Sequence, residues 1–208
     1  MQQVHDLFPT PVMRVSPALE PTLVAQLVDH FSGRSDLVAN QASQSLVHTA
    51  MLAPSDSPLM VAAAGAIVPK LAEFGQLLFG ETLGWAIKEM WVNVMQTGGL
   101  QATHNHANSF ISGVVYLTAI DDNARTVFMR TPGGADFAFR NDHAGAQRNA
   151  YNSPTWTAPD IKAGDMILFP SYLLHTVPPN PGGRRITLSL NAIPTQLNNW
   201  GYTISFGA

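Results

Sequence analysis

The sequence predicts a mainly β fold, a jelly-roll sandwich with two N-terminal helices packed on one of its sheets. In the first third of the chain, apolar residues recur with the period of an amphipathic helix. From Trp85 onward the period changes to two, and short apolar runs alternate with turns rich in Gly, Pro and Asn. No helical pattern separates these runs, which favours antiparallel pairing and a sandwich or barrel.

Composition is consistent with one compact domain. The chain has 208 residues, of which 46% are hydrophobic and 12% charged, and this size suits a single core. We therefore expect one domain over 1–208, with a helical part at about 1–84 and a jelly-roll core at about 85–208. The absence of cysteine excludes disulfides, thiolate metal sites and a cysteine nucleophile.

Charge and hydropathy limit the partners that we expect. A net charge of -3 provides no basic field, so we expect no nucleic-acid partner. The longest wholly apolar stretch, 59–68, is too short to span a bilayer, and no signal-peptide pattern precedes it. The expectation is a cytoplasmic protein without a membrane partner.

Two Ser-Pro pairs predict the helix starts. Ser followed by Pro is typical of an N-cap and the first helical position. Ser16-Pro17 predicts a first helix that ends near Gly33, and Ser57-Pro58 predicts a second helix that runs to Phe79.

Period-two patterns predict the strands. The first covers 88–95 and is expected to end at Gly98-Gly99. The others are expected at 111–118, 126–130, 136–140, 166–169, 185–192 and 202–206. The segment 141–159 is polar and predicts a long loop. It could be a lid over a substrate or a plain surface insertion.

Three histidines form the best candidate metal site. His104 and His106 are two residues apart, so in an extended segment both imidazoles point to one side. A pair at this spacing is a weak signal by itself, because surface histidines often show it. His175 follows the strand expected at 166–169, and distant strands become neighbours in a jelly roll. The three could hold one metal ion and leave positions open for substrates.

Arg185 is the candidate anchor for an acidic co-substrate. It begins the strand expected at 185–192, and Thr187 lies on the same face. A guanidinium binds a carboxylate through two donors, and the hydroxyl can add a third. Arg184 points the other way and is interpreted as a solvated surface residue. Asn191, on the face of Arg185, is a secondary candidate.

This combination resembles the iron(II)- and 2-oxoglutarate-dependent dioxygenases. Their pattern is His-x-Asp, a distal His, an Arg or Lys about ten residues later, and often a hydroxyl residue two further along. More closely, the chain is similar to a group of bacterial and phage oxygenases. The residues that carry this likeness are the opening 7–12, the stretch 104–117 and Phe169-Pro170-Ser171.

The resemblance implies a double-stranded β-helix of cupin-like jelly-roll form that binds Fe(II) and 2-oxoglutarate. His104, His106 and His175 would be the metal ligands, with no catalytic residue beyond them. Arg185 and Thr187 would bind 2-oxoglutarate. In related enzymes a Tyr at the place of Tyr116 can contact the co-substrate, and a core Tyr is the alternative. Asn93, on one face of the strand at 88–95, could line the pocket or be a satisfied core amide.

One residue departs from the family pattern: His106 stands where the pattern has Asp. A neutral imidazole leaves a higher net charge on the metal than a carboxylate does. Asp165, Asp121 and Asp122 are the remaining carboxylates that could substitute. Asp165 lies in a predicted turn and Asp121-Asp122 at the end of a predicted strand, which makes them weaker candidates.

The leading hypothesis is an oxygenase that hydroxylates an unidentified small-molecule or peptide substrate with O2. A zinc-type hydrolase or lyase is the first alternative, because three histidines with an open position also describe catalytic zinc. A non-catalytic cupin-like metal-binding module is the second. An exposed edge strand would allow pairing into a homodimer.

Overall fold

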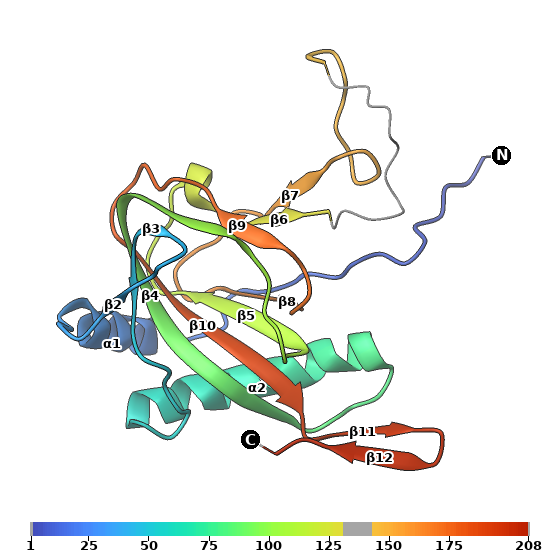
Figure 1. Ribbon diagram of the computed structural model, residues 1–208, viewed down its shortest axis with the longest axis horizontal. Helices are drawn as coiled ribbons and strands as arrows, with labels where there is room; N and C mark the ends of the chain where they lie inside the picture. Colours follow the sequence, from blue (N-terminus) through green and yellow to red (C-terminus); the bar gives the residue numbers. More distant parts are fainter. Residues whose placement is uncertain (1, 131–142, 208) are drawn as a thin grey trace.

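The computed structural model describes residues 2–130 and 143–207. It is a curled antiparallel jelly roll in which two sheets share one long strand (Figure 1). The strands are β1 (Met13–Val15), β2 (Val38–Ala39), β3 (Gln44–His48), β4 (Trp85–His104), β5 (Ile111–Tyr116), β6 (Val127–Met129), β7 (Thr155–Thr157), β8 (Met166–Pro170), β9 (His175–Val177), β10 (Arg185–Pro194), β11 (Gln196–Asn199) and β12 (Tyr202–Ser205).

Strand β4 belongs to both sheets. The larger sheet has the order β1–β8–β5–β10–β4 and continues from β4 through β3 to β2, and the smaller has the order β4–β9–β6–β7. Strands β11 and β12 form a separate hairpin. In Figure 1 the smaller sheet lies above the larger one. The mainly β, jelly-roll class is confirmed.

Two glycines inside β4 let it pass from one sheet to the other. The sequence predicted that the strand ends at Gly98-Gly99, and this is wrong: β4 runs on to His104. Gly98 has a φ of 78°, a conformation that favours glycine. A Cβ on Gly99 would lie 2.7 Å from the carbonyl oxygen of Ser45. The glycines therefore bend the strand without ending it, and the bend carries His104 to the smaller sheet.

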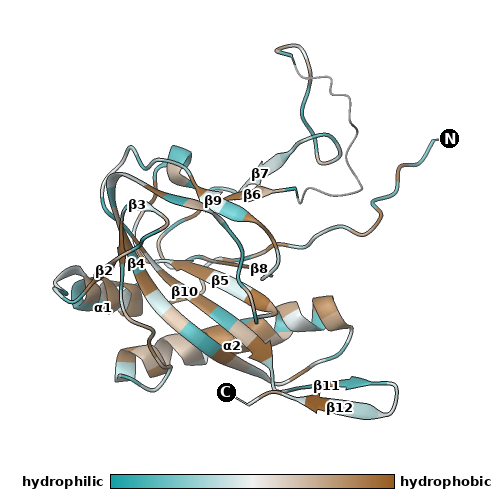
Figure 2. Cartoon of the chain, in the orientation of Figure 1, coloured by the Kyte–Doolittle hydropathy of each residue, from teal (hydrophilic) through white to brown (hydrophobic). Residues whose placement is uncertain are grey.

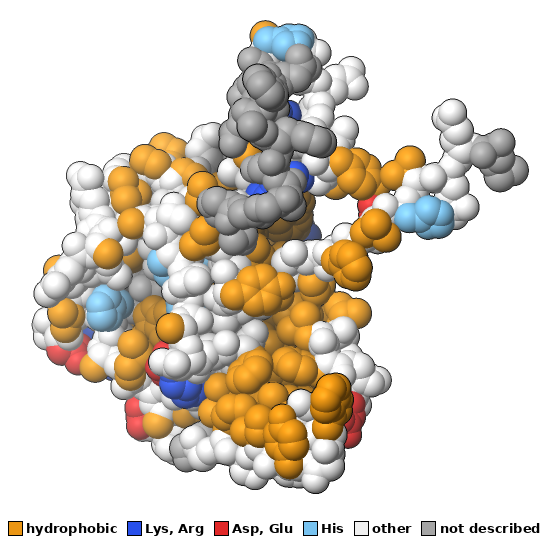
Figure 3. All heavy atoms as spheres, turned by 45° about the vertical axis from the view of Figure 1, so that its right-hand side comes forward, with side chains coloured by type: hydrophobic (Ala, Val, Ile, Leu, Met, Phe, Trp, Pro, Cys, Tyr) orange, Lys and Arg blue, Asp and Glu red, His pale blue; other side chains and the backbone are white. Residues whose placement is uncertain are grey.

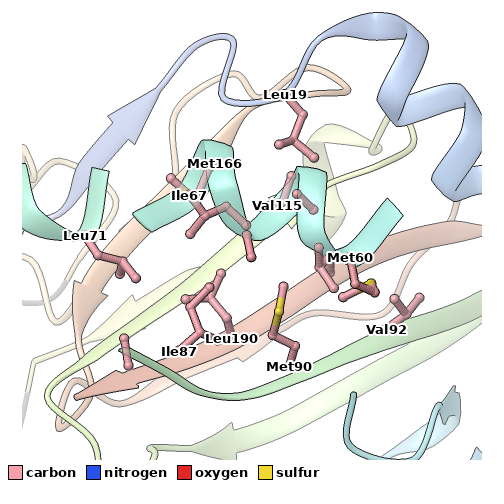
Figure 4. Packing of buried hydrophobic residues seen from close by; sticks show 14 of the residues in the cluster. Leu19, Met60, Ile67, Leu71, Ile87, Met90, Val92, Val115, Met166 and Leu190 are labelled. Carbon is pink, nitrogen blue, oxygen red and sulfur yellow. The ribbon is translucent and has the colours of Figure 1, made fainter. Parts of the chain in front are cut away.

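Helix α2 (Pro58–Phe79) covers the outer face of the larger sheet, as its sequence predicts. The Ser57 hydroxyl accepts a hydrogen bond from the Met60 amide at 3.2 Å, and Gly80 ends the helix in the left-handed conformation with a φ of 72°. Figure 4 shows side chains of the helix, Ile67 and Leu71 among them, directed toward Leu190 and neighbouring strand residues. Burial of these apolar side chains supplies the main stabilisation of the fold.

Helix α2 is also the one helix in the described residues that is long and apolar enough to cross a membrane by length and composition. Of its most apolar window, 39% is buried inside the fold. A core helix passes the same test, and the packing of α2 on the larger sheet is that of a core helix. Figure 2 shows the helix mostly in the hydrophobic colours.

Helix α1 spans Pro21–Ser32, so the start predicted at Ser16-Pro17 is wrong. Residues 16–19 are instead hydrogen-bonded to the turn before β8. The amides of Ala18 and Leu19 donate to the Gly164 carbonyl at 2.8 and 3.0 Å. The Ser16 hydroxyl donates to a carboxylate oxygen of Asp165 at 2.6 Å. Glu20 takes the N-cap position, and Pro21 supplies the proline of the first turn.

The short strands were the least predictable elements. The strands β1, β2, β3, β7, β9 and β11 were not expected. Strand β7 lies inside the expected loop at 141–159 and pairs with β6. The strand expected at 136–140 and the first two residues of that loop lie outside the described residues. The expected strands that are described do occur, with ends that differ by a few residues and a much longer β4.

Candidate metal centre

His104, His106 and His175 come together where the two sheets meet. His104 is the last residue of β4 and is paired in register with His175, the first residue of β9. His106 follows two residues after the end of β4. One ring nitrogen from each lies within 4.8 Å of the others. The ring centroids of His104 and His175 are 4.2 Å apart, and His106 lies 5.1 and 5.2 Å from these two rings.

Backbone carbonyl groups orient two of the rings. Nδ1 of His104 donates to the Ala102 carbonyl at 2.8 Å, and Nδ1 of His175 donates to the Leu173 carbonyl at 2.9 Å. A carbonyl oxygen can only accept, so the proton of each neutral ring is on Nδ1 and the lone pair is on Nε2. This is the arrangement in which metal-binding histidines are usually held. The donor set therefore fits a divalent transition metal.

Burial keeps the three imidazoles neutral. Desolvation is the largest cause that lowers the pKa of His175 to about 3, with repulsion from His104 next. The same causes lower the pKa of His106 to about 4. Desolvation also lowers the pKa of His104. Neutral imidazole is the form that binds a metal, so at neutral pH no proton has to leave these rings before an ion can bind.

Arg185 is buried beside the histidines without an acidic partner. Its side chain is 3% exposed, and none of the described acidic residues pairs with it. Its Nε is without a hydrogen-bond partner, and its guanidinium carbon lies 5.4 Å from the centre of the Tyr116 ring. Burial lowers the pKa of the guanidinium, and the neighbouring Tyr116 opposes this effect. A buried, unpaired charge is unfavourable, so the site is built for an anionic ligand.

A pocket joins this arginine to the histidines. We call it the histidine pocket. It is lined by Trp91, Asn93, Gln101, His104, His106, Gly113, Val114, Thr126, His175, Val177, Arg185, Thr187 and Ser189.

The structure brings together most of the residues that the sequence singled out. Asn93 and Thr187 line the histidine pocket, and Oδ1 of Asn93 is buried without a hydrogen-bond partner. Tyr116 lies next to Arg185, but its hydroxyl bonds to Thr126 at 2.8 Å and it does not line the pocket. That these residues bind a co-substrate stays a prediction.

The remaining carboxylates lie elsewhere. Asp165 is bound by Arg14, at 2.6 Å, and by Ser16. Asp121 caps the short 3-10 helix Asp122–Ala124, of which Asp122 is the first residue. None of these aspartates lines the histidine pocket. His106 therefore has no substitute carboxylate among them.

Sequence reasoning did not single out Gln101 and Thr126. Nε2 of Gln101 lies 3.4 Å from Nε2 of His104, and Thr126 holds the hydroxyl of Tyr116. Gln101 follows the two glycines that were expected to end β4. Had β4 been continued past them, Gln101 would have been recognised as part of the strand that carries His104.

Comparison with known proteins agrees with this site. Residues 89–191 match the family model described as "Putative 2OG-Fe(II) oxygenase". These residues include the three histidines and Arg185. None of the curated proteins compared with the chain matches it.

Solved structures share the fold. The epimerase SnoN from nogalamycin biosynthesis, described as non-heme and alpha ketoglutarate dependent, is 16% identical, with 90% of this chain and 80% of that one covered and a TM-score of 0.64. A Pseudomonas putida prolyl-4-hydroxylase is 16% identical over 88% and 92% of the two chains, with a TM-score of 0.61. HygX from Streptomyces hygroscopicus, solved with nickel and 2-oxoglutarate bound, is 12% identical. The match covers 89% of this chain and 84% of HygX, with a TM-score of 0.62.

The fold is that of a jelly-roll enzyme, and its three histidines could hold one metal ion. The chain belongs to the superfamily of Fe(II)/2-oxoglutarate-dependent oxygenases. At identities below a quarter, the solved structures support the fold alone. Members of this class use a substrate and O2 in general.

Proposed function

We propose that the chain holds iron(II) through His104, His106 and His175, and that it hydroxylates an organic substrate with the use of 2-oxoglutarate and O2. The observation that carries this proposal is the buried guanidinium of Arg185, which has no acidic partner and shares a pocket with the three histidines. An oxo-diacid has a carboxylate for the arginine at one end and a chelating group for a metal at the other.

The residues of the chain have separate tasks in this reaction. Arg185 and Thr187 would hold the distal carboxylate of 2-oxoglutarate, because a guanidinium and a hydroxyl supply hydrogen bonds in a pocket shielded from water. The buried pocket walls exclude solvent from the reacting groups. When bound, iron(II) and 2-oxoglutarate supply the oxidising chemistry, in which O2 is consumed and 2-oxoglutarate is split into succinate and CO2.

Neither alternative, the zinc-type hydrolase or the metal-binding module, explains why Arg185 is buried without an acidic partner. A hydrolytic zinc site needs a metal-bound water and a substrate, but it does not require a buried arginine without a counter-ion. Keeping a desolvated charge in the core of the site is unfavourable unless a ligand compensates for it. This difference favours the oxygenase.

The proposal is tested in two steps on the purified protein. We expect that iron(II) and 2-oxoglutarate, mixed with the protein without oxygen, give a visible metal-to-ligand charge-transfer band. Admission of O2 should then bleach the band and release succinate, even without the organic substrate, at a slow uncoupled rate. The control is the same mixture with succinate in place of 2-oxoglutarate, which should give no band. If zinc alone supports hydrolysis of a screened ester and no band forms, the hydrolase is the better hypothesis.

A further inference from the structure

A second pocket lies on the other side of His106. It has a volume of about 440 Å³ and shares His106 with the histidine pocket. Its apolar walls are Leu78, Phe79, Phe110, Pro170 and Tyr172, and we call it the aromatic pocket. The volume falls in the range of pockets that hold small organic ligands, roughly 300–1,000 Å³.

The walls of the aromatic pocket are fixed to the metal site by the backbone. The amide of His106 donates to the Ser171 carbonyl at 3.0 Å, and the Ser171 amide donates to the Phe110 carbonyl at 3.1 Å. The Phe110 amide in turn donates to Ala192 of β10 at 3.1 Å. The ring of Phe110 also lies 5.8 Å from that of Phe79, at the end of α2. The pocket is therefore preformed, which limits the ordering cost of binding.

The chemistry of the lining selects an uncharged ligand. No residue that lines the aromatic pocket is an Asp, Glu, Lys or Arg. Tyr172 is 62% exposed, so its ring is accessible to a ligand. The face turned forward in Figure 3 carries a broad area of hydrophobic side chains in its lower half. Asn105 and Ser109 are the polar groups that could orient a ligand by hydrogen bonds.

From this geometry we propose that the aromatic pocket holds the organic substrate and that this substrate is a neutral molecule with an aromatic or similarly flat apolar part. The proposal rests on the proposed oxygenase function. His106 lines both pockets, so a ligand in the aromatic pocket would lie next to the metal site. A charged substrate would lose its hydration there without gaining a partner.

Three probes of equal size test the proposal: para-fluorobenzyl alcohol, para-fluorobenzylamine and para-fluorobenzoate. Fluorine NMR reports their binding to protein loaded with 2-oxoglutarate and either manganese(II) or zinc(II), without oxygen. 2-Oxoglutarate occupies Arg185, so benzoate cannot bind there. We expect the neutral alcohol to bind best and its resonance to broaden strongly with paramagnetic manganese but little with zinc, since the pocket adjoins the metal.

Tyr172→Ala should weaken binding of the alcohol about two- to tenfold, the usual contribution of one aromatic contact. Tyr151→Ala is the matched control, because Tyr151 is 57% exposed and lies outside the pocket. Equal binding of alcohol and amine, no effect of Tyr172→Ala, or equal broadening with both metals would each overturn the substrate assignment. If 2-oxoglutarate does not bind the metal-loaded protein at all, the oxygenase proposal itself fails. This outcome is measured in the absence of the fluorinated probes, so it is distinct from a failure of the substrate assignment.

A separate observation concerns Nδ1 of His106 and the side chains next to it. Nδ2 of Asn191 donates to a carboxylate oxygen of Glu89 at 2.9 Å and lies 3.5 Å from Nδ1 of His106. The Asn191 side chain is 2% exposed, and its oxygen accepts a hydrogen bond from the Ser112 hydroxyl at 2.7 Å. This fixes the amide between the carboxylate and the imidazole.

We infer that Glu89, acting through Asn191, is a positioning residue for His106 and supplies nearby the negative charge that an aspartate ligand would bring. The other carboxylate oxygen of Glu89 pairs with Lys88 at 2.8 Å. The carboxylate fixes the Asn191 amide, which in turn positions the imidazole, and its negative charge stabilises a cation bound nearby. Glu89 lies on β4, four residues before Asn93. The buried Asn191 amide connects its carboxylate to the His106 ring.

Glu89→Gln keeps the shape of the side chain and removes its charge. We expect it to weaken cobalt(II) binding roughly 10- to 100-fold in calorimetry, the usual effect of losing such a partner. The anaerobic charge-transfer band should move to shorter wavelength, because a less electron-rich metal gives up charge less readily. Glu89→Asp should restore part of the affinity.

Glu73→Gln is the matched control for Glu89→Gln. Glu73 lies on α2, is 57% exposed and pairs with Lys70, so its substitution removes the same charge far from the site. Cobalt(II) affinity of Glu89→Gln equal to that of Glu73→Gln, or an unmoved band, would overturn the role of Glu89.

Discussion

Arg185→Met is expected to abolish useful binding of 2-oxoglutarate while leaving the metal in place. Loss of one partner of a buried, hydrogen-bonded charge pair costs about 2–5 kcal/mol. The Kd of 2-oxoglutarate for the nickel(II)-loaded protein should therefore rise between about 30-fold and a few thousand-fold. Calorimetry measures both affinities, and the Kd for nickel(II) itself should stay within a few-fold of the wild-type value.

The same substitution should raise the stability of the ligand-free protein. The guanidinium of Arg185 is buried without an acidic partner, and replacing a buried charge by an apolar side chain of similar size is often neutral or stabilising. We expect a higher Tm for Arg185→Met than for wild type. Loss of ligand binding together with gained stability is the mark of a residue kept for function.

Arg184→Met is the control. Arg184 is the neighbour along the chain, and Nη2 of its guanidinium donates to the Ser32 hydroxyl at 2.8 Å on the protein surface. Its loss should change neither the affinity for 2-oxoglutarate nor the Tm by much, since exposed polar contacts contribute little. Normal binding of 2-oxoglutarate by Arg185→Met would contradict the assigned anchor.

The features that the sequence predicted well are those encoded over a few neighbouring residues. The signals that start and end helix α2, namely Ser57, Pro58 and Gly80, lie in or directly beside the helix itself. The face of β10 that holds Arg185 and Thr187 follows from alternation alone. The three histidines could be placed at one site because two of them share a strand end, and the jelly-roll pattern brings a later strand beside it.

The features that the sequence predicted poorly depend on contacts between distant segments. Ser16-Pro17 has a helix-start pattern, but Ser16 is used to bind Asp165, which is 149 residues away. Gly98-Gly99 resembles a strand end, and only the pairing of β4 with both sheets shows that it is a bend. Glu89 and Asn191 meet because β4 and β10 are paired, and no local pattern in either strand indicates that they flank His106.

His175→Ala has the second large effect that we expect, and it differs in kind from that of Arg185→Met. The two remaining histidines come from one strand end, and they hold an ion at two positions instead of three. Loss of a partner that only orients a ligand already costs about 10- to 100-fold in metal affinity. Loss of the ligand itself should exceed this, so nickel(II) binding at micromolar protein should become undetectable in calorimetry.

The variant also separates folding from metal binding. The ring of His175 is 4% exposed and donates to the Leu173 carbonyl, so its removal leaves a small cavity and lowers the Tm of the ligand-free protein. His175→Gln retains most of the volume and should lose the metal equally. His143→Ala, at an exposed histidine outside the site, should bind nickel(II) as wild type does.

The two substitutions together test how the co-substrate is held. If 2-oxoglutarate binds both the metal and Arg185, then Arg185→Met loses 2-oxoglutarate and keeps nickel(II), whereas His175→Ala loses both. A protein that bound 2-oxoglutarate through the arginine alone would retain it in His175→Ala. Retention of nickel(II) at wild-type affinity in His175→Gln would mean that the ion is held elsewhere. The pattern expected here requires one pocket in which the histidines and Arg185 face the same ligand, as the shared lining of the histidine pocket indicates.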